Sequence, residues 1–473
     1  MLLLSCNAPE DRAIEIILVE GAGSNSFSHE DDPGAQVIRA ATHEGLVSFD
    51  AEGRIRPGIA ERWIVTDDGL SYIFRIANGL TAPDGTQVDA AMVRNTLRKA
   101  IASQDNTALG LDLDIIDNVR ARTGRVVEVQ LSAPMPEFLQ LLAHPTLALV
   151  DRVNDDGMVL SEQDGRASLV PRPIPGTSDA SGSSLPIRPL QLRRLAPLEA
   201  VTEFEEGAAD ILLGGGIDAL PHVRRGGLLR GTIRLDPVAG LFGLGVAPGG
   251  GFLADAANRE VLSLALDREQ LITPFGIGGG WSPRIGIAPP ELSALAGQDA
   301  PQWQALPLEQ RQAIASARVA QWQAANEQIA PLSIALPQGR GGELILTRLK
   351  ADYAAIGINL VRADDANRAD LWLIDAVSSY SQPDWYLNRL NCKVTRAACS
   401  AQADALVEQA RSESDPIVRA YLLTRAEAEL TAVQGYVSFG QPVRFSLVRG
   451  GLAGFAVNPW AIHPLSALGR GPS

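Results

Sequence analysis

Several residue types and motifs that commonly support catalysis are scarce or absent in this 473-residue chain. There are only three lysines, Lys99, Lys350 and Lys393, which leaves few candidates for Schiff-base chemistry. The five histidines are all more than four residues apart, so the chain has no HExxH-type metal site. A Walker A loop and a Gly-x-Ser-x-Gly elbow are also missing. We therefore expect no cofactor, no metal site and no enzymatic activity.

No run of 18 or more apolar residues occurs, which excludes a membrane-spanning helix by the usual length criterion. The formal net charge is −14, which argues against nucleic acid as a partner because that partner is itself a polyanion. Hydrophobic residues make up 46% of the chain and charged residues 20%, as in proteins with a large folded core. The length corresponds to roughly three domain-sized units.

The three cysteines favour an exported protein. The segment 3–6 (Leu-Leu-Ser-Cys) is similar to a lipobox, in which Cys6 would carry a lipid anchor; the alternative is an ordinary hydrophobic start with a free cysteine. Cys392 and Cys399 lie close together, and we expect them to form a disulfide, as is typical of proteins in oxidising compartments. We expect a periplasmic or cell-surface location, with residues 1–11 as the remnant of a lipoprotein signal and a linker.

Hydrophobic periodicity predicts an α/β protein. Strands at 63–66 and 71–76 flank an Asp-Asp-Gly turn and form a hairpin, and the alternation at 126–132 indicates an edge strand. Asp89 is the expected N-cap of a helix over 90–101, whereas 170–189 is rich in Pro, Ser and Gly and indicates a loop or a crossover between subdomains. The strand, helix and strand expected between 332 and 361 form a β-α-β unit, which indicates a parallel sheet.

An ordered run of short motifs resembles family 5 of the extracellular solute-binding proteins, the peptide, nickel and dipeptide receptors of ABC importers. It comprises 44–47 (Glu-Gly-Leu-Val), 57–63 (Pro-Gly-Ile-Ala-Glu-Arg-Trp), 68–74 (Asp-Gly-Leu-Ser-Tyr-Ile-Phe) and 84–86 (Asp-Gly-Thr). The similarity continues through 206–210, the helix pair at 258–268 and the Ile-Gly-Ile of 356–358, and covers about residues 12–465. Within it, Asp267 and Arg268 are expected to cap a helix and to pair on a surface or between lobes.

This resemblance implies a periplasmic-binding-protein-like fold of type II, similar to cluster C, with two α/β lobes and a ligand cleft between them. We expect an N-terminal lobe over 12–240 with a subdomain at about 50–150, a C-terminal lobe over 241–440, and a tail, 441–473, that returns to the first lobe. The implied partners are a peptide or other small solute and the permease subunits of an ABC importer, with the binding protein itself a monomer.

The sequence departs from the family pattern where the ligand is expected to bind. Peptide-binding members carry an Asp in a Trp-x-x-Asp-Tyr-x-x-Pro motif, which pairs with the α-ammonium of the peptide; here 376–383 reads Ala-Val-Ser-Ser-Tyr-Ser-Gln-Pro, with Ser379 in place of the Asp. A hydroxyl is a weaker partner for a buried ammonium than a carboxylate. We therefore expect weak binding of free peptides. The predicted ligand-binding residues are the following: Phe27, Phe242, Ser379, Tyr380, Asp384 and Trp385.

Two functions follow from these observations. The first is the substrate-binding component of an ABC importer that takes up a peptide or peptide-like solute. The second is a degenerate binding fold that acts as a sensor or a structural surface protein, which the missing Asp and the altered 151–200 region favour.

Overall fold

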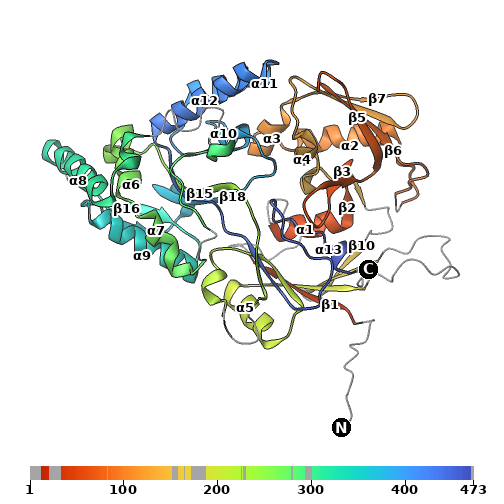
Figure 1. Ribbon diagram of the computed structural model, residues 1–473, viewed down its shortest axis with the longest axis horizontal. Coiled ribbons are helices and arrows are strands. Elements are labelled where there is room, and N and C mark those ends of the chain that lie inside the picture. The colour runs from red at the N-terminus through yellow and green to blue at the C-terminus, as the bar shows by residue number, and fades with distance from the viewer. Residues whose placement is uncertain are drawn as a thin grey trace, which may run out of the picture.

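The computed structural model describes residues 12–20, 33–82, 84–151, 158–163, 166–171, 188–224, 226, 231–277, 281–292, 301–326 and 328–469. Three large sheets, two two-stranded sheets and their helices make up these residues (Figure 1). No helix of these residues has the length and apolar character needed to cross a membrane. The predictions for Cys6 and Phe27, and most of those for 170–189, concern residues outside the described part.

The first sheet has seven strands and is built from three distant parts of the chain. Its order is β10-β11-β12-β1-β13-β20-β14, and β1 runs parallel to both of its neighbours. The strands are β1 (Ile14–Val19), β10 (Met158–Gln163), β11 (Arg166–Pro171), β12 (Leu190–Leu195), β13 (Ile211–Gly215), β14 (Ile233–Leu235) and β20 (Phe445–Val448). Helices α1 (Pro33–Thr42), α5 (Pro197–Glu206) and α13 (Leu465–Leu468) belong to this region.

The second sheet is antiparallel, with the order β5-β6-β8-β7, and is formed by one continuous stretch of chain. Its strands are β5 (Ala60–Val65), β6 (Ser71–Ile76), β7 (Ile116–Ala121) and β8 (Val126–Leu131). The associated helices are α2 (Ala90–Ala102), α3 (Ala108–Leu113) and α4 (Phe138–Leu142). Two short strand pairs connect this region to the rest: β2 (His43–Glu44) with β9 (Val150–Asp151), and β3 (Val47–Phe49) with β4 (Ile55–Pro57). The predicted hairpin is β5 and β6, and Asp89 caps α2 by accepting a hydrogen bond from the Met92 N–H at 2.8 Å.

The third sheet is mixed and has the order β17-β16-β18-β15-β19. Its strands are β15 (Gly240–Val246), β16 (Leu332–Ala335), β17 (Leu360–Arg362), β18 (Leu371–Val377) and β19 (Tyr436–Gly440). The parallel pairing of β16 with β17 across α9 (Arg340–Ala354) is the predicted β-α-β unit. The other helices are α6 (Ala256–Ala265), α7 (Arg268–Ile272), α8 (Leu308–Ala325), α10 (Pro383–Arg389), α11 (Ala401–Arg411) and α12 (Pro416–Val433).

Two predictions made from local sequence need correction. The strand at 126–132 is not an edge strand, because β8 lies between β6 and β7 and pairs with both. Part of the expected loop at 170–189 is strand, since β11 extends to Pro171 and pairs with β10 and β12. A disulfide joins Cys392 and Cys399, whose Cα atoms are 5.3 Å apart, and this is the pairing that the sequence indicated.

The chain passes twice between the seven-stranded and five-stranded sheets, at 236–239 and at 441–444. A buried network fixes the first crossover: Asp236 accepts a hydrogen bond from the Asn458 N–H at 3.0 Å and lies 3.2 Å from the His463 ring. After the second crossover, β20 inserts between β13 and β14. The domain boundaries at 240 and 440 stay a prediction, although both fall next to these crossovers.

A buried carboxylate connects the four-stranded region to the helices near the end of the chain. The Asp112 side chain in α3 is fully buried, and its Oδ2 is 2.6 Å from Nη1 of Arg389 in α10. The Tyr380 hydroxyl and the Asn388 amide donate hydrogen bonds to Oδ1 at 2.9 and 2.8 Å. The apolar side chains around this group form one core that includes both Phe138 and residues of α10–α12. Figure 1 shows α3 beside α10.

We expect Asp112→Ala to destabilise the protein by about 3–5 kcal/mol, because it leaves the Arg389 charge buried without its partner. The free energy of unfolding measured by urea denaturation checks this. Asp114→Ala is the matched control, since the Asp114 side chain is 53% exposed and lies 3.5 Å from Arg411. A loss no larger than that of the control would contradict the role of Asp112.

A second buried carboxyl lies where the seven-stranded sheet meets α9. Asp218 follows β13, and its Oδ1 is buried with no hydrogen-bond partner among the described residues. Close packing at this junction requires a glycine in α9, because a Cβ at Gly341 would lie 2.3 Å from the Ile217 carbonyl oxygen. Burial, and then the charge of Asp375, raise the pKa of Asp218 to about 6. Arg444, which pairs with Asp375 at 2.8 Å, only partly offsets this.

This raised pKa predicts a pH-dependent effect of Asp218→Asn. The folded state binds the Asp218 proton more tightly than the unfolded state, whose pKa is near 3.8, so stability is lost as the pH rises from about 4 through about 6. The variant is therefore expected to be more stable than the wild type at pH 7.5, by up to about 3 kcal/mol, and about equally stable at pH 4. Calorimetric unfolding at the two pH values measures this. Asp67→Asn, in an exposed turn, is the control, and an equal effect of Asp218→Asn at both pH values would refute the prediction.

Candidate functional site

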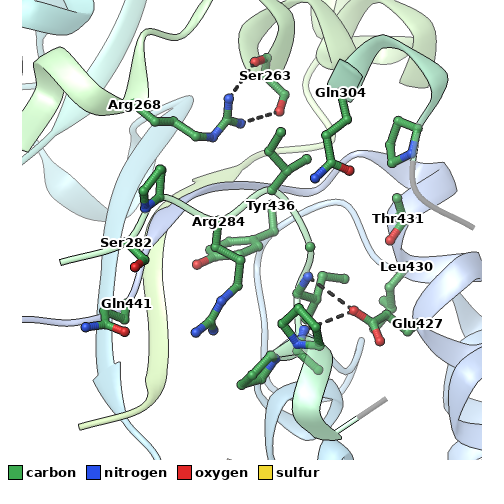
Figure 2. Close-up of a pocket in the computed structure, with 18 of the residues that line it drawn as sticks. Ser263, Arg268, Ser282, Arg284, Gln304, Glu427, Leu430, Thr431, Tyr436 and Gln441 are labelled. Atoms are coloured by element: carbon green, nitrogen blue, oxygen red, sulfur yellow. Dashed lines mark hydrogen bonds between the residues drawn. The ribbon is translucent and has the colours of Figure 1, made fainter. Parts of the chain in front are cut away.

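A cavity of about 1330 Å³ opens beside the two crossovers (Figure 2). All of its lining residues lie between Pro237 and Gln441. Its walls are α7, α12, β19, the segment 282–291 and the residues that lead into α8, and the crossovers supply Pro237, Val238, Ala239 and Gln441. The seven-stranded sheet contributes no described residue to this cavity, so the cavity belongs to the C-terminal α/β region.

Backbone contacts hold the segment 281–288 against β19. Pro283 forms a β-bridge with Gly440, and the Arg284 N–H donates to the Phe439 carbonyl at 3.2 Å. The Trp281 indole donates to the Gln441 carbonyl at 2.9 Å. Glycine is needed at 440, since a Cβ there would lie 2.3 Å from the Trp281 ring. The side chains of this segment are therefore presented to the cavity from a fixed backbone.

Glu427 of α12 holds the other end of the same segment. Its Oε1 accepts hydrogen bonds from the N–H groups of Ile287 and Ala288 at 3.2 and 2.9 Å (Figure 2). Burial raises the pKa of Glu427, and these two hydrogen bonds and the charge of Arg284 partly counteract that rise. The carboxylate therefore has a structural partner on one oxygen.

Two of the three arginines on the cavity wall are used by the protein itself. Arg268 is 5% exposed, and its guanidinium donates to the carbonyl oxygens of Ser438 and Ser263 at 2.8 and 3.1 Å. Burial, followed by the nearby charge of Arg311, lowers the pKa of Arg268 to about 10. Arg311 donates to the carbonyl oxygens of Leu264 and Leu266, each at 3.2 Å. The prediction that Asp267 caps a helix is confirmed, because it accepts from the Gln270 N–H, and Asp267 also pairs with Arg348 at 3.8 Å. The predicted pairing of Arg268 is not seen among the described residues, where Arg268 binds carbonyl and hydroxyl oxygens.

Arg284 differs from these two arginines. Its guanidinium donates one long hydrogen bond, 3.4 Å, to the Gly240 carbonyl, and the Tyr386 side chain lies close enough to interact with it as well. No carboxylate of a described residue lies within 4.0 Å of its guanidinium. Burial raises the pKa values of Tyr386, Tyr436 and Glu427, and the nearby charge of Arg284 opposes each rise. In Figure 2 the Arg284 side chain extends into the cavity, away from Arg268 and Ser263. It is thus a positive group with unused donors.

The structure places the predicted ligand-binding residues away from this cavity. Phe242 is fully buried and packs edge-on against Phe439, with ring centroids 5.4 Å apart. Tyr380 and Trp385 are each 1% exposed and belong to the core shared with the four-stranded region. Asp384 pairs with Arg419 at 3.0 Å, so its charge is already engaged.

Ser379 is adjacent in the chain to a residue that contacts the cavity wall. Its neighbour Ser378 donates a backbone hydrogen bond at 2.8 Å to the carbonyl of Ala239, which lines the cavity. The Ser379 hydroxyl is buried and has no hydrogen-bond partner among the described residues.

The cavity residues Arg284, Glu427 and Tyr436 were not predicted from the sequence. Their only local signal is the cluster of prolines at 283, 289 and 290, which indicates an ordered irregular segment but not a binding site. Within the described part of the chain, no group of three or more His, Cys, Asp or Glu side chains is arranged to hold a metal ion. The chemistry of the cavity is therefore that of charged and polar side chains on a partly apolar wall.

We expect Glu427→Ala to destabilise the protein by about 1–3 kcal/mol, because two backbone N–H groups lose their acceptor. Glu427→Gln keeps an acceptor oxygen and should cost less. Thermal unfolding compares the two variants, and Glu429→Ala, in the same helix but not bonded to 281–288, is the control. An Ala variant as stable as the Gln variant would show that Glu427 does not hold this segment.

Comparisons with known proteins identify relatives along the chain. Residues 54–177 match the model of the bacterial extracellular solute-binding proteins, family 5, middle region. The chain is 26% identical over 460 residues to a probable deoxycholate-binding periplasmic protein of Escherichia coli K12, covering 84% of this chain and 82% of that protein. It is 27% identical over 140 residues to a glutathione-binding protein of Escherichia coli O1:K1. The matched segment covers 29% of this chain but only 27% of the length of that relative.

Solved structures share the fold over nearly the whole chain. An oligopeptide-binding protein of Haemophilus influenzae, OppA, in complex with the peptide RPPGFSPFR, superposes with a TM-score of 0.80 at 19% identity and covers 97% of this chain and 99% of its own. The murein tripeptide-binding protein MppA of Escherichia coli gives a TM-score of 0.78 at 19% identity, covering 96% and 98% of the two chains. Its unliganded open form gives only 0.60, at 18% identity and 96% coverage of each chain.

Proposed function

We propose that this chain, which belongs to family 5 of the bacterial extracellular solute-binding proteins, captures a peptide or peptide-like solute and delivers it to the membrane permease of an ABC importer. The observation that carries this proposal is the fold match over 97% of the chain to a protein solved with a bound peptide. The relatives are substrate-binding proteins of importers and not enzymes.

The two-crossover architecture supports capture by lobe movement. In the described part of the chain, the seven-stranded and five-stranded sheets are connected at 236–239 and at 441–444, and such paired connections allow two lobes to rotate about a few residues. The lower similarity to the unliganded open form of MppA supports a closed arrangement in the described state. Solute would stabilise this arrangement, and the permease would recognise it.

The ligand class in this proposal follows from the loop after β18. Ser379 supplies a hydroxyl where peptide-binding members place a carboxylate, and the nearby Asp384 is engaged by Arg419. A free α-ammonium would therefore be buried without a fixed countercharge, which is costly. We propose that the solute is a modified or blocked peptide, or another peptide-like compound. Anchoring of the protein to the membrane through Cys6 is part of the same proposal.

The alternative is a binding fold that serves as a sensor or a structural surface protein. The observation that favours it is the packing of Tyr380 and Trp385, from the family's ligand loop, into a core shared with Phe138 and Leu141. Such packing opposes free movement of that loop. Measurement of solute uptake separates the two functions.

The proposal is tested by native mass spectrometry of the purified protein, to identify the co-purified solute, followed by uptake of that solute in cells with and without the gene. Loss of uptake on deletion is expected; unchanged uptake with the solute still bound would favour the sensor or structural role. Release of no solute and binding of none from a peptide mixture would overturn the binding function itself.

Calorimetry should also show that unmodified tripeptides bind more weakly than N-acetylated ones, and that Ser379→Asp raises the affinity for the unmodified series. The introduced carboxylate can pair with the α-ammonium of the peptide and so add to the binding free energy a part of the roughly 2–5 kcal/mol that is lost when one partner of a buried charge pair is removed. Ser379→Asn, which is similar in size but uncharged, is the control. Sub-micromolar binding of free tripeptides by the wild type would show that another group supplies the countercharge.

A further inference from the structure

Arg284 is the one of the three cavity arginines whose donors are left for a ligand. Arg268 and Arg311 are bound by main-chain carbonyl groups, as described above. Arg284 donates one long hydrogen bond, 3.4 Å, to the Gly240 carbonyl, its other near neighbour is the neutral Tyr386 side chain, and it forms no ion pair with any described residue. A guanidinium has five N–H donors, and leaving most of them unused at a half-buried site is unfavourable unless a ligand or water accepts them.

The backbone around Arg284 makes it suitable as a fixed anchor. The bridge from Pro283 to Gly440 and the bond from the Arg284 N–H to Phe439 attach this residue to β19. Glu427 holds the following residues, Ile287 and Ala288, to α12. A side chain with a fixed base loses less conformational entropy when it binds a ligand than one on a free loop.

The acidic groups on the same wall do not neutralise Arg284 by direct contact. Asp267 caps α7, and its Oδ2 lies 3.8 Å from Arg348. Glu427 accepts two backbone hydrogen bonds. The remaining acids that line the cavity, Glu269 and Glu291, are exposed residues whose charges water and salt screen. A negative group that enters the cavity can therefore reach Arg284 without displacing a protein carboxylate.

We infer that Arg284 binds the carboxylate of the imported solute, and that the solute is an acid whose amino group is blocked or absent. This inference rests on the proposed function and specifies its substrate class. A carboxylate is planar and matches the two parallel N–H donors of a guanidinium. The opposite requirement, a carboxylate for an α-ammonium, is missing because residue 379 is Ser. The charge pattern thus selects the acidic end of a peptide-like solute and not its amino end.

The size of the cavity agrees with a solute of more than one residue. Its volume, about 1330 Å³, exceeds the roughly 300–1,000 Å³ typical of pockets for drug-sized molecules. Gln304, Gln441 and Thr431 add neutral hydrogen-bonding groups to the wall, which suit amide bonds (Figure 2). N-acylated di- and tripeptides with a free carboxylate are therefore the probes of choice.

The test compares N-acetylated di- and tripeptides as free acids with the same peptides as C-terminal amides, by calorimetry on the full chain. For the wild type, the acids should bind about tenfold or more tightly than the amides. Arg284→Gln should remove this preference by weakening the acids alone, and Arg284→Lys should retain part of it because it keeps the charge but loses the fork of donors. Arg98→Gln, an exposed position on α2 far from the cavity, is the matched control and should behave as the wild type.

Equal affinity for acids and amides, no binding of any probe, or a preference that persists in Arg284→Gln would overturn the inference. If Arg284→Gln does not fold, the wild-type comparison and Arg284→Lys still decide between these outcomes. This binding comparison can also be judged separately from transport, because it is measured on the purified protein. Acids that bind through Arg284 without being imported would sustain this inference and refute delivery to a permease, whereas import of a solute without a carboxylate would do the reverse.

Discussion

The two connections between the seven-stranded and five-stranded sheets constrain nearly every other feature of the molecule. They set β15 and β19 side by side at one sheet and send β14 and β20 to the other. The buried Asp236, held by Asn458 and the His463 ring, fixes the chain immediately before the first connection. A single apolar core that includes both Leu212 and Phe439 lies across the junction. The cavity lies beside these connections, which supply Pro237, Val238, Ala239 and Gln441 to its wall.

Local sequence predicted those parts of the fold that depend on local chemistry. The N-caps Asp89 and Asp267, the β5–β6 hairpin and the β-α-β unit each arise from residues within about one element of one another. The family motifs extended this to the overall architecture. Strand neighbours were harder to predict: 126–132 has the alternation of an edge strand, yet Ile116–Ala121 covers its outer side. Nothing within that strand specifies whether a neighbour will pair with it.

The site could be predicted less well than the fold, for a physical reason. Tyr380 and Trp385 have the composition of ligand-binding aromatics, but their surroundings are set by α3 and Phe138, which lie more than 200 residues earlier in the chain. Arg284 is the opposite case. As one of 41 basic residues, it could not be recognised as a binding residue from the sequence, because that requires knowing which partners the neighbouring arginines use. A charged side chain stabilises the fold if protein groups already bind it, and it can bind a ligand if they do not. The three-dimensional contacts, and not the sequence, show which of the two applies.

The position of β20 has a consequence for how the protein is made. Residues 445–448 occupy an interior place in the seven-stranded sheet, between β13 and β14, although they are near the end of the chain. During synthesis the four-stranded sheet, which uses only residues 60–131, has all of its strands early, whereas the larger sheet waits for the last 30 or so residues. Until then β13 and β14 lack their shared neighbour, and unpaired strand edges of this kind can join with other chains. The late arrival of one short strand thus keeps this sheet incomplete until residues 445–448 have been synthesised.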